Sequence, residues 1–337
     1  MLKTLQIITG LFLLFGSGST AQNISSKPWT SACDSVLIKQ LSNKNLTFKG
    51  GLELYSEADI PSGGFSGLHI SENGNRLLSI SDFSAGKSFT DSLRAKWFIF
   101  EPTFSSSMKL LSVNQVNSGQ ILGPDQIPFS EIESIAPSDS GFYISADNKR
   151  GKGDHIYPLI INTPEPNASI PVGPDPIKIL GFEKHSKQGI EAMTTIRDSL
   201  LFLIHENNPN REYRYAWIIN SKSGKTQQKL YVAKFGEIKG LSTLKNGNIL
   251  VLEKLYQTGI TTVDISILNQ TELTEDSIRS KSILRVTSSC LDNFEGIACF
   301  ERNGKEYFMI VSDNNGDWQK PGRQKTLLLL FELRPKK

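Results

Sequence analysis

The chain has 337 residues, of which 38% are hydrophobic and 21% are charged, and this composition is typical of a globular protein rather than a disordered or fibrous one. Its 37 basic and 34 acidic side chains give a net charge of only +3, and no basic run carries interleaved aromatic residues, so the sequence does not indicate nucleic-acid binding. The length fits two average domains or one large repeat domain.

The first 21 residues have the pattern of a secretory signal peptide. Lys3 supplies the positive end, residues 5–15 form a short apolar core, and the small residues Ser19 and Ala21 precede a cleavage site. The apolar core is too short to span a bilayer, and no other segment approaches the roughly 18 apolar residues that a spanning helix needs. We therefore expect an exported protein, periplasmic or extracellular, whose mature form has no membrane span.

Export makes disulfide bonds feasible, and the chain has three cysteines: Cys33, Cys290 and Cys299. Cys299 lies in an apolar segment and has the pattern of a small buried residue. Cys33 and Cys290 lie in polar segments that flank strands, so we predict a bridge between them, although spacing alone does not fix the pairing. No Cys/His spacing of a zinc site is present in the sequence.

Residues 22–45 are polar, with few periodic apolar positions, and are expected to form a lead-in segment. From residue 46 to residue 335 the pattern changes to short runs rich in β-branched and aromatic residues, separated by Gly, Asn, Asp, Ser and Pro. Such runs are typical of strands joined by turns, and no long segment has the 3.6-residue period of a helix. We therefore predict one all-β domain over residues 46–335.

One unit recurs five times in this domain: a short apolar strand with one polar residue, a tight turn, and a second apolar strand closed by an acid. Three of the turns contain Asn-Gly, which supplies the positive φ of a tight hairpin turn. The polar residues of the first strands are, in chain order, Ser66, Glu133, Glu191, Lys239 and Glu295. The closing acids are Asp82, Asp147, Glu206, Glu253 and Asp313.

The first-strand polar residues are 67, 58, 48 and 56 residues apart, and further strands lie between the units. Each unit therefore holds about four strands, which is the size of a propeller blade. We expect residues 47–55 to supply the missing strand of the last blade and to close the ring. Five blades fit this count, and six fit if the longest spacing hides a further blade.

In a propeller the first strand of each blade lines the central channel, so the five polar residues are expected to form a ring around the axis. Three carboxylates that face one another need a counter-charge. Either a divalent cation such as Ca²⁺ or the ammonium group of Lys239 supplies it, and both compete for the same oxygen atoms. A metal site and a salt-bridged channel both fit this pattern.

The closing acids also have two interpretations. An acid followed by Asn or Gly at a strand end is ordinary turn chemistry. Alternatively, the five acids form a rim around one mouth of the channel, with Asn314 as a neutral hydrogen-bonding partner. Of the four scattered histidines, His205 is the best functional candidate, because it directly precedes a rim acid.

These strand motifs together resemble the esterase-like phytase family of bacterial exported proteins. The matching segments are Phe65-Ser66-Gly67-Leu68 with Ser81-Asp82, Ile132-Glu133-Ser134-Ile135-Ala136, Gly189-Ile190-Glu191-Ala192, Leu250-Val251-Leu252-Glu253, and Asn293-Phe294-Glu295-Gly296 with Val311-Ser312-Asp313-Asn314. The resemblance covers residues 48–335. It implies a propeller and the hydrolysis of phosphoesters or esters, and it specifies the fold more closely than the reaction.

A more distant similarity, to the calcium-dependent apyrases, implies a five-bladed propeller in which inner-strand Ser and Glu residues bind one Ca²⁺ in the channel. Carried onto this chain, the ligands are Ser66, Glu133, Glu191 and Glu295. Lys239 departs from that pattern, because a neutral ligand is expected at its position and a cation opposes a metal ion.

Two functions follow from these expectations. The first is a Ca²⁺-dependent hydrolase of a small phosphorylated or ester substrate, in which the metal orients a water and Glu133, Glu191 or Glu295 acts as the general base. A serine esterase of the α/β-hydrolase type is excluded, because no Gly-x-Ser-x-Gly motif occurs. The second is a non-catalytic propeller that binds a ligand or partner and has a structural metal or a salt-bridged channel. In both cases we expect a monomer.

Overall fold

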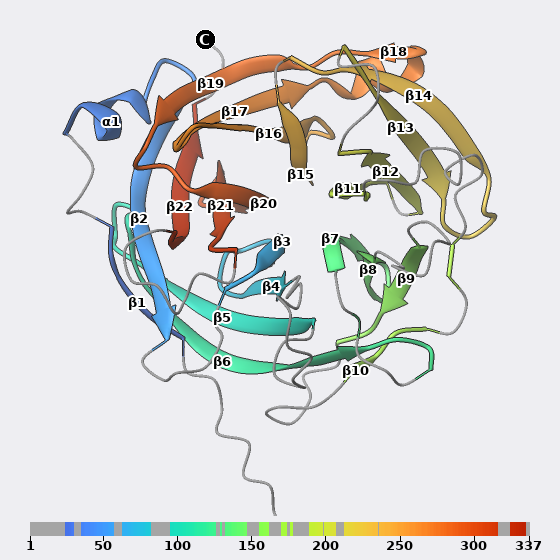
Figure 1. Cartoon of the computed structure of the whole chain (residues 1–337), viewed down its shortest axis with the longest axis horizontal. Helices are drawn as coiled ribbons and strands as arrows, with labels where there is room; N and C mark the ends of the chain where they lie inside the picture. Colours follow the sequence, from blue (N-terminus) through green and yellow to red (C-terminus); the bar gives the residue numbers. More distant parts are fainter. Residues whose placement is uncertain are drawn as a thin grey trace, which may run out of the picture.

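The computed structural model describes residues 24–29, 35–56, 63–81, 95–125, 129, 132–146, 155–161, 170–173, 176–177, 189–197, 199–206, 212–234, 236–315 and 324–334. Within these residues, five mainly antiparallel sheets stand around a central axis like the blades of a propeller (Figure 1). The prediction of an all-β propeller is confirmed, and the number of blades is five.

Each blade is one sheet, and its strands follow one another outward from the axis. Blade one consists of β3 (Phe65–Ile70), β4 (Leu77–Ser81), β5 (Lys96–Phe104), β6 (Leu110–Leu122) and β10 (Ile170–Pro171). Blade two consists of β7 (Ile132–Ser138), β8 (Gly141–Ala146) and β9 (His155–Leu159). Blade three consists of β11 (Ala192–Arg197), β12 (Leu200–Ile204), β13 (Tyr213–Asn220), β14 (Thr226–Val232) and β18 (Ser277–Ile278).

The last two blades adjoin each other and carry most of the site described below. Blade four consists of β15 (Glu237–Thr243), β16 (Ile249–Gln257), β17 (Ile260–Leu268) and β19 (Lys281–Ser288). Blade five consists of β20 (Asn293–Arg302), β21 (Lys305–Asp313), β22 (Thr326–Leu333), β2 (Leu46–Ser56) and β1 (Ile24–Pro28). The described residues also include a helix, α1 (Ser35–Gln40), and a 3₁₀ turn, η2 (Gln270–Thr274).

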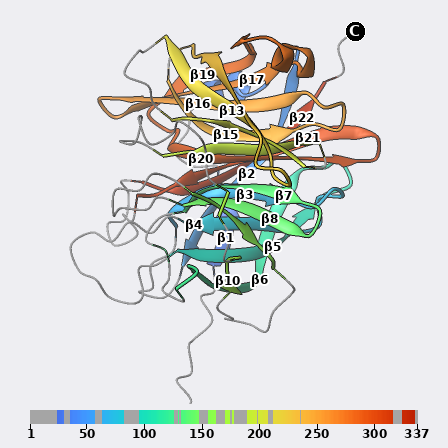
Figure 2. The ribbon, with the colours of Figure 1, turned by 90° about the vertical axis from the view of Figure 1, so that its right-hand side faces the viewer.

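The innermost strands β3, β7, β11, β15 and β20 contact one another in a closed ring around the channel. In the view turned by 90°, the inner strands run across the picture, along the axis that Figure 1 shows end-on (Figure 2). One residue position along these strands therefore corresponds to one level of the channel.

The ring is closed by blade five, which contains both ends of the domain. β2 pairs with β22 from Leu46 opposite Leu333 to Leu54 opposite Thr326, as expected for residues 47–55. β1, from the segment expected as a lead-in, adds an outer strand by pairing with β2. Separation of the two ends of the domain would therefore open the ring.

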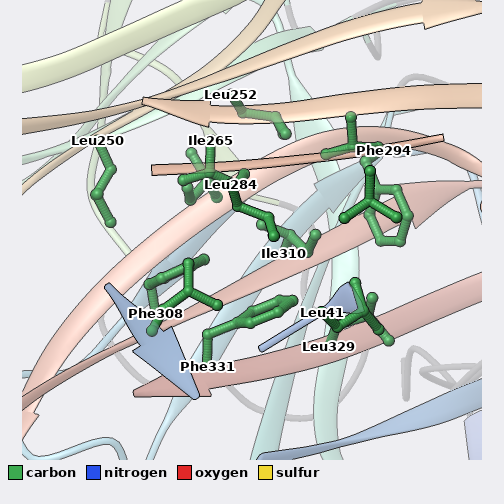
Figure 3. Close-up of a cluster of buried hydrophobic side chains, with 14 of the residues drawn as sticks. Leu41, Leu250, Leu252, Ile265, Leu284, Phe294, Phe308, Ile310, Leu329 and Phe331 are labelled. Atoms are coloured by element: carbon green, nitrogen blue, oxygen red, sulfur yellow. The ribbon is translucent and has the colours of Figure 1, made fainter. Parts of the chain in front are cut away.

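The largest core cluster lies between blades four and five. β21 places Phe308 and Ile310 in this cluster, while Met309 and Val311 on its other face pack toward blade one. Phe308 stacks on Phe331 with the ring centroids 4.9 Å apart, and both lie in the cluster shown in Figure 3. Burial on both faces explains why the central strands read as continuous apolar runs rather than as alternating ones.

The predictions for the N-terminal region remain predictions. The signal peptide and Cys33 lie outside the described residues. α1 contacts β19, and the expected bridge between Cys33 and Cys290 stays a prediction. Within the part of the chain that the structure describes, no helix is long and apolar enough to cross a membrane.

Candidate functional site

Four of the five expected ring residues are the extra residue of a β-bulge. In the pairing of β3 with β4, Phe65 lies opposite Ser81 and Gly67 opposite Ile80, so Ser66 has no partner in the ladder. The same shift in register occurs at Glu133, Lys239 and Glu295. A bulge re-aims the side chain of its extra residue and increases the local twist. The fifth ring residue, Glu191, directly precedes the first residue of β11.

The residue after each ring position is small, and the packing of neighbouring blades explains why. A Cβ added to Gly240 would lie 2.8 Å from Cγ2 of Ile297 on the next inner strand. A Cβ added to Gly296 would lie 3.0 Å from Cβ of Leu68. The five small residues are Gly67, Ser134, Ala192, Gly240 and Gly296. The repeated motif is thus a polar bulge residue followed by a position where two inner strands approach closely.

Lys239, on β15 of blade four, joins ring and rim carboxylates from blades three and five. Its Nζ donates to Oε2 of Glu191 at 3.2 Å and to Oε1 of Glu206, and it lies 3.4 Å from Oε2 of Glu295. Burial alone would lower the pKa of Lys239, but Glu191, Glu295 and Glu206 together raise it well above the ordinary value. Lys239 is therefore a buried, charged ammonium group with carboxylates on several sides.

Lys254, on β16, is a second buried cation that the sequence reasoning missed. Its Nζ donates to Oε1 of Glu295 at 3.0 Å and to Oδ1 of Asn293, and it lies 3.5 Å from Oε2 of Glu237. The available signal was the closing pair of the fourth unit, which reads Glu253-Lys254 where units two, three and five have an acid followed by Asn.

We call Glu191, Glu206, Glu295, Asp313, Lys239 and Lys254 the carboxylate–lysine cluster. Burial would raise the pKa of Glu295, but Lys239 and Lys254 lower it below its usual value. Asp313 has the opposite shift, because burial and the charge of Glu295 raise its pKa to about 7. Burial also raises the pKa of Glu191 well above its ordinary value, against the effect of Lys239.

The expected rim acids separate into three groups. Glu206 and Asp313 belong to the cluster, and Asn314 lies beside Asp313 and accepts a hydrogen bond from the backbone N–H of Gly64 at 3.4 Å. Glu253 instead accepts hydrogen bonds from the Tyr231 hydroxyl at 3.0 Å and from the N–H of Lys234 at 3.2 Å, in a separate buried network. Asp82 and Asp147 lie outside the described residues.

The remaining candidates take other positions around the channel. The Ser66 hydroxyl donates to the backbone carbonyl of Ile132 in the next blade. Glu133 is 8% exposed at its bulge in blade two. His205 is buried, with its ring 6.5 Å from that of Trp217, and it directly precedes Glu206.

The expected calcium site can be tested against these contacts. Ca²⁺ takes six to eight oxygen ligands, and the ammonium groups of Lys239 and Lys254 already contact the carboxylates of Glu191 and Glu295. Among the described residues, no group of three or more His, Cys, Asp or Glu side chains is arranged to hold a metal ion. The four expected ligands therefore do not fit a calcium ion while both lysines keep these positions.

Comparison with solved structures finds glycoside hydrolases of low sequence identity. One is a family 43 arabinoxylan arabinofuranohydrolase from Bacillus subtilis, with 8% identity, a TM-score of 0.49, and coverage of 81% of this chain and 64% of that one. Another is CoXyl43, a β-xylosidase/α-arabinofuranosidase from a compost microbial metagenome, with 9% identity, a TM-score of 0.48, and coverage of 82% and 93%.

The sequence comparisons concern the family itself. No curated protein matches the chain. A family model described as phytase-like, esterase-like activity of phytase, matches residues 60–316, which is most of the chain and includes all five ring residues. The resemblance seen in the strand motifs is thereby confirmed, and the chain belongs to the phytase-like family.

Proposed function

We propose that this protein hydrolyses ester or phosphoester bonds at the carboxylate–lysine cluster. Membership of a family described by esterase-like activity supports a hydrolase. The observation that carries the proposal is the pair formed by Glu295 and Asp313 on neighbouring strands, whose proton affinities are shifted in opposite directions. Two carboxyl groups whose pKa values are pushed apart are suited to the roles of base and acid.

In this proposal, Glu295 and Asp313 share the proton transfers of hydrolysis. The ionised carboxylate of Glu295 takes a proton from water as the water oxygen bonds to the carbonyl carbon or phosphorus atom. Asp313, with a pKa of about 7, gives its proton to the leaving oxygen as the ester bond breaks. Lys239 and Lys254 hold Glu295 ionised and fixed.

The charge of the cluster favours an uncharged ester over a phosphate dianion. Both ammonium groups are engaged by carboxylates, and burial of further negative charge beside Glu191, Glu206 and Glu295 is costly. The proposed reaction does not depend on calcium, because the carboxylate oxygens of Glu191 and Glu295 already contact ammonium groups.

A second candidate function is a non-catalytic propeller whose channel is sealed by these ion pairs. The observation that favours it is that one ammonium group, that of Lys239, contacts three carboxylates at once. In that case the cluster fixes neighbouring blades to one another. Export, to a periplasm or to the outside of the cell, and a monomeric state are part of both proposals and rest on the sequence.

The test is hydrolysis of p-nitrophenyl acetate, p-nitrophenyl phosphate, nucleotides and phytate, each with and without calcium. We expect p-nitrophenyl acetate to be the best substrate and Glu295→Gln to lower its turnover at least ~100-fold, the usual contribution of a general base. Asp313→Asn should remove the pH dependence near pH 7. Glu53→Gln, which changes a carboxylate on the outer strand β2, is the matched control and should keep full activity.

Equal activity in the wild type and Glu295→Gln would remove Glu295 from the chemistry. Hydrolysis that requires calcium would restore the metal-dependent mechanism in place of the one proposed. Lack of turnover on all four substrate types would favour the non-catalytic propeller.

A further inference from the structure

The end of the channel where the hairpin turns lie contains a cavity. The cavity measures about 760 Å³ and has lining residues from all five inner strands, among them Leu68, His69, Ile135, Thr194, Ser242 and Cys299. This volume is typical of a pocket for a small molecule. Cys299 is four residues after Glu295 on β20, about 13 Å along an extended strand, so the cavity and the carboxylate–lysine cluster occupy different levels of the channel.

Most polar groups of the cavity wall already have partners within the wall. The hydroxyls of Thr194 and Thr243 lie 3.0 Å apart, and the Ser242 hydroxyl donates to Sγ of Cys299 at 3.1 Å. Together with Leu68 and Ile135, these groups present a mainly apolar surface to the cavity.

His69 differs from these polar residues, because its imidazole has no hydrogen-bonding partner among the described residues of the wall. Its ring packs edge-on against Phe142, with the centroids 5.0 Å apart, and no described residue forms a hydrogen bond with its imidazole nitrogens. Burial lowers the pKa of His69 to about 4, so the imidazole is neutral at pH 7. A neutral imidazole can donate one hydrogen bond and accept another, so His69 offers a ligand a polar contact inside an apolar wall.

The rim of the cavity has an excess of acidic side chains. Glu301 and Glu306 lie directly opposite each other on β20 and β21, which is an unfavourable arrangement for like charges. Lys245 contacts Glu301 at 2.9 Å, while burial and the nearby Glu301 raise the pKa of Glu306. Glu72 and Asp139 also line the cavity, against two cationic lining residues, Arg197 and Lys245, and Asp139 is paired with Lys222 at 3.2 Å.

We propose that this cavity binds a small organic cation: a primary ammonium compound with an apolar body about the size of an arylethylamine. The ammonium group lies between Glu301 and Glu306 and relieves the repulsion of their charges. The apolar body packs on Leu68 and Ile135, and the neutral imidazole of His69 provides a hydrogen-bonding contact. An anion is disfavoured at this mouth, so the cavity differs in ligand class from a phosphate site.

The test uses calorimetric titration of the full chain with three probes of similar size: phenethylammonium, 2-phenylethanol and phenylacetate. We expect phenethylammonium to bind at least ~10-fold more tightly than either of the others, which corresponds to about 1.4 kcal/mol in the free energy of binding. Glu306→Gln should weaken phenethylammonium binding about 5-fold or more and leave 2-phenylethanol binding unchanged. Thr195→Trp, which fills the cavity from β11, should abolish binding of all three probes.

Glu53→Gln, which changes a carboxylate on the outer strand β2, is the matched control, and it should leave all three affinities unchanged. The assay also separates the inference from the proposed hydrolase, because binding is measured and no turnover is required. Equal affinities for the three probes, or no saturable binding of phenethylammonium up to about 10 mM, would overturn the proposal. If Thr195→Trp does not fold, the test depends on Glu306→Gln. An unchanged affinity of Glu306→Gln for phenethylammonium would then overturn the proposal.

Discussion

The two ends of the channel are built from the same five strands, but their charged side chains differ in burial. They are mostly buried at one end and exposed or half-buried at the other. Where the inner strands start, the buried Glu191 and Glu295 and the half-buried Glu206 contact two lysine side chains. Near the hairpin turns, Glu301 and Glu306 lie opposite each other on the paired strands β20 and β21, and both line a cavity. A difference of four residues along β20, from Glu295 to Cys299, thus separates the ion-paired level from the level that lines the cavity.

The comparison shows how a repeat with one backbone pattern acquires specific chemistry. Both lysines of the cluster come from blade four, and both contact Glu295 of blade five. One blade supplies the positive charge and its neighbours supply the negative charge, so the ion pairs cross the boundaries between blades. At the cavity end the pair of Lys245 and Glu301 also joins blades four and five, but there the lysine side chain is exposed.

The largest expected effect is at Lys239. Lys239→Met leaves the buried Glu191 and Glu295 and the half-buried Glu206 without this ammonium group, and loss of one partner from a buried ion pair costs about 3–5 kcal/mol. The free energy of unfolding, from urea denaturation at pH 7.5, should fall by that amount. Lys245→Met, at the exposed ion pair of the cavity end, is the control and should stay within experimental error.

A fall of less than about 1 kcal/mol for Lys239→Met would mean that the cluster behaves like an exposed pair. The contrast between the two ends would then be absent.

The next effect concerns pH. The folded-state pKa of Asp313, about 7, is above its ordinary value of 3.8, so between these values the folded protein holds a proton that the unfolded chain has lost. This group therefore contributes stability that decreases as the pH rises from about 4 to about 7. Asp313→Asn should be more stable than the wild type at pH 8 by about 4 kcal/mol, at about 1.4 kcal/mol for each pKa unit. Near pH 4 the two proteins should differ little.

Denaturation curves of both proteins from pH 4 to pH 8 measure this difference. If it is constant across that range, Asp313 does not titrate in the way described.

The smallest effect has the opposite sign and lies at the cavity end. Glu306→Gln removes one of two like charges that face each other across β20 and β21, so the free energy of unfolding should rise by about 0.2–1 kcal/mol. Glu332→Gln is the control on the neighbouring strand β22. It removes a carboxylate held by Lys49 at 3.1 Å and Lys305 at 2.7 Å, so stability should decrease slightly. A decrease in the free energy of unfolding of Glu306→Gln would show that repulsion between Glu301 and Glu306 does not destabilise the fold.

The fold was predictable because its signals are local and repeated. The Asn-Gly turns and the polar residue within each first strand recur at blade-sized spacing, and this recurrence gives the five blades. The closing strand was predictable from the shortage of strands after Glu295. The outer strand β1 was missed, because the segment around it is polar and a strand at the edge of a sheet needs only a few buried residues.

The site was harder to predict, because its contacts depend on register. Glu253 and Lys254 are adjacent on β16, and the sequence does not say which of them faces the channel. β-bulges at Lys239 and Glu295 shift the pairing by one residue, so a count of alternating positions cannot decide this question. The ring positions were accessible from the sequence, whereas the partners of each ring residue required the three-dimensional arrangement of blades four and five.

The most direct test of the central proposal, that lysines rather than a metal ion neutralise the channel carboxylates, is calcium binding by the wild type and by Lys239→Ser. After dialysis, the wild type should hold less than about a tenth of an equivalent of calcium, and added calcium should not change its melting temperature. Lys239→Ser, which adds a hydroxyl oxygen and removes the cation, should melt at a higher temperature when calcium is present. One equivalent of calcium in the wild type, with a rise in its melting temperature, would contradict the account.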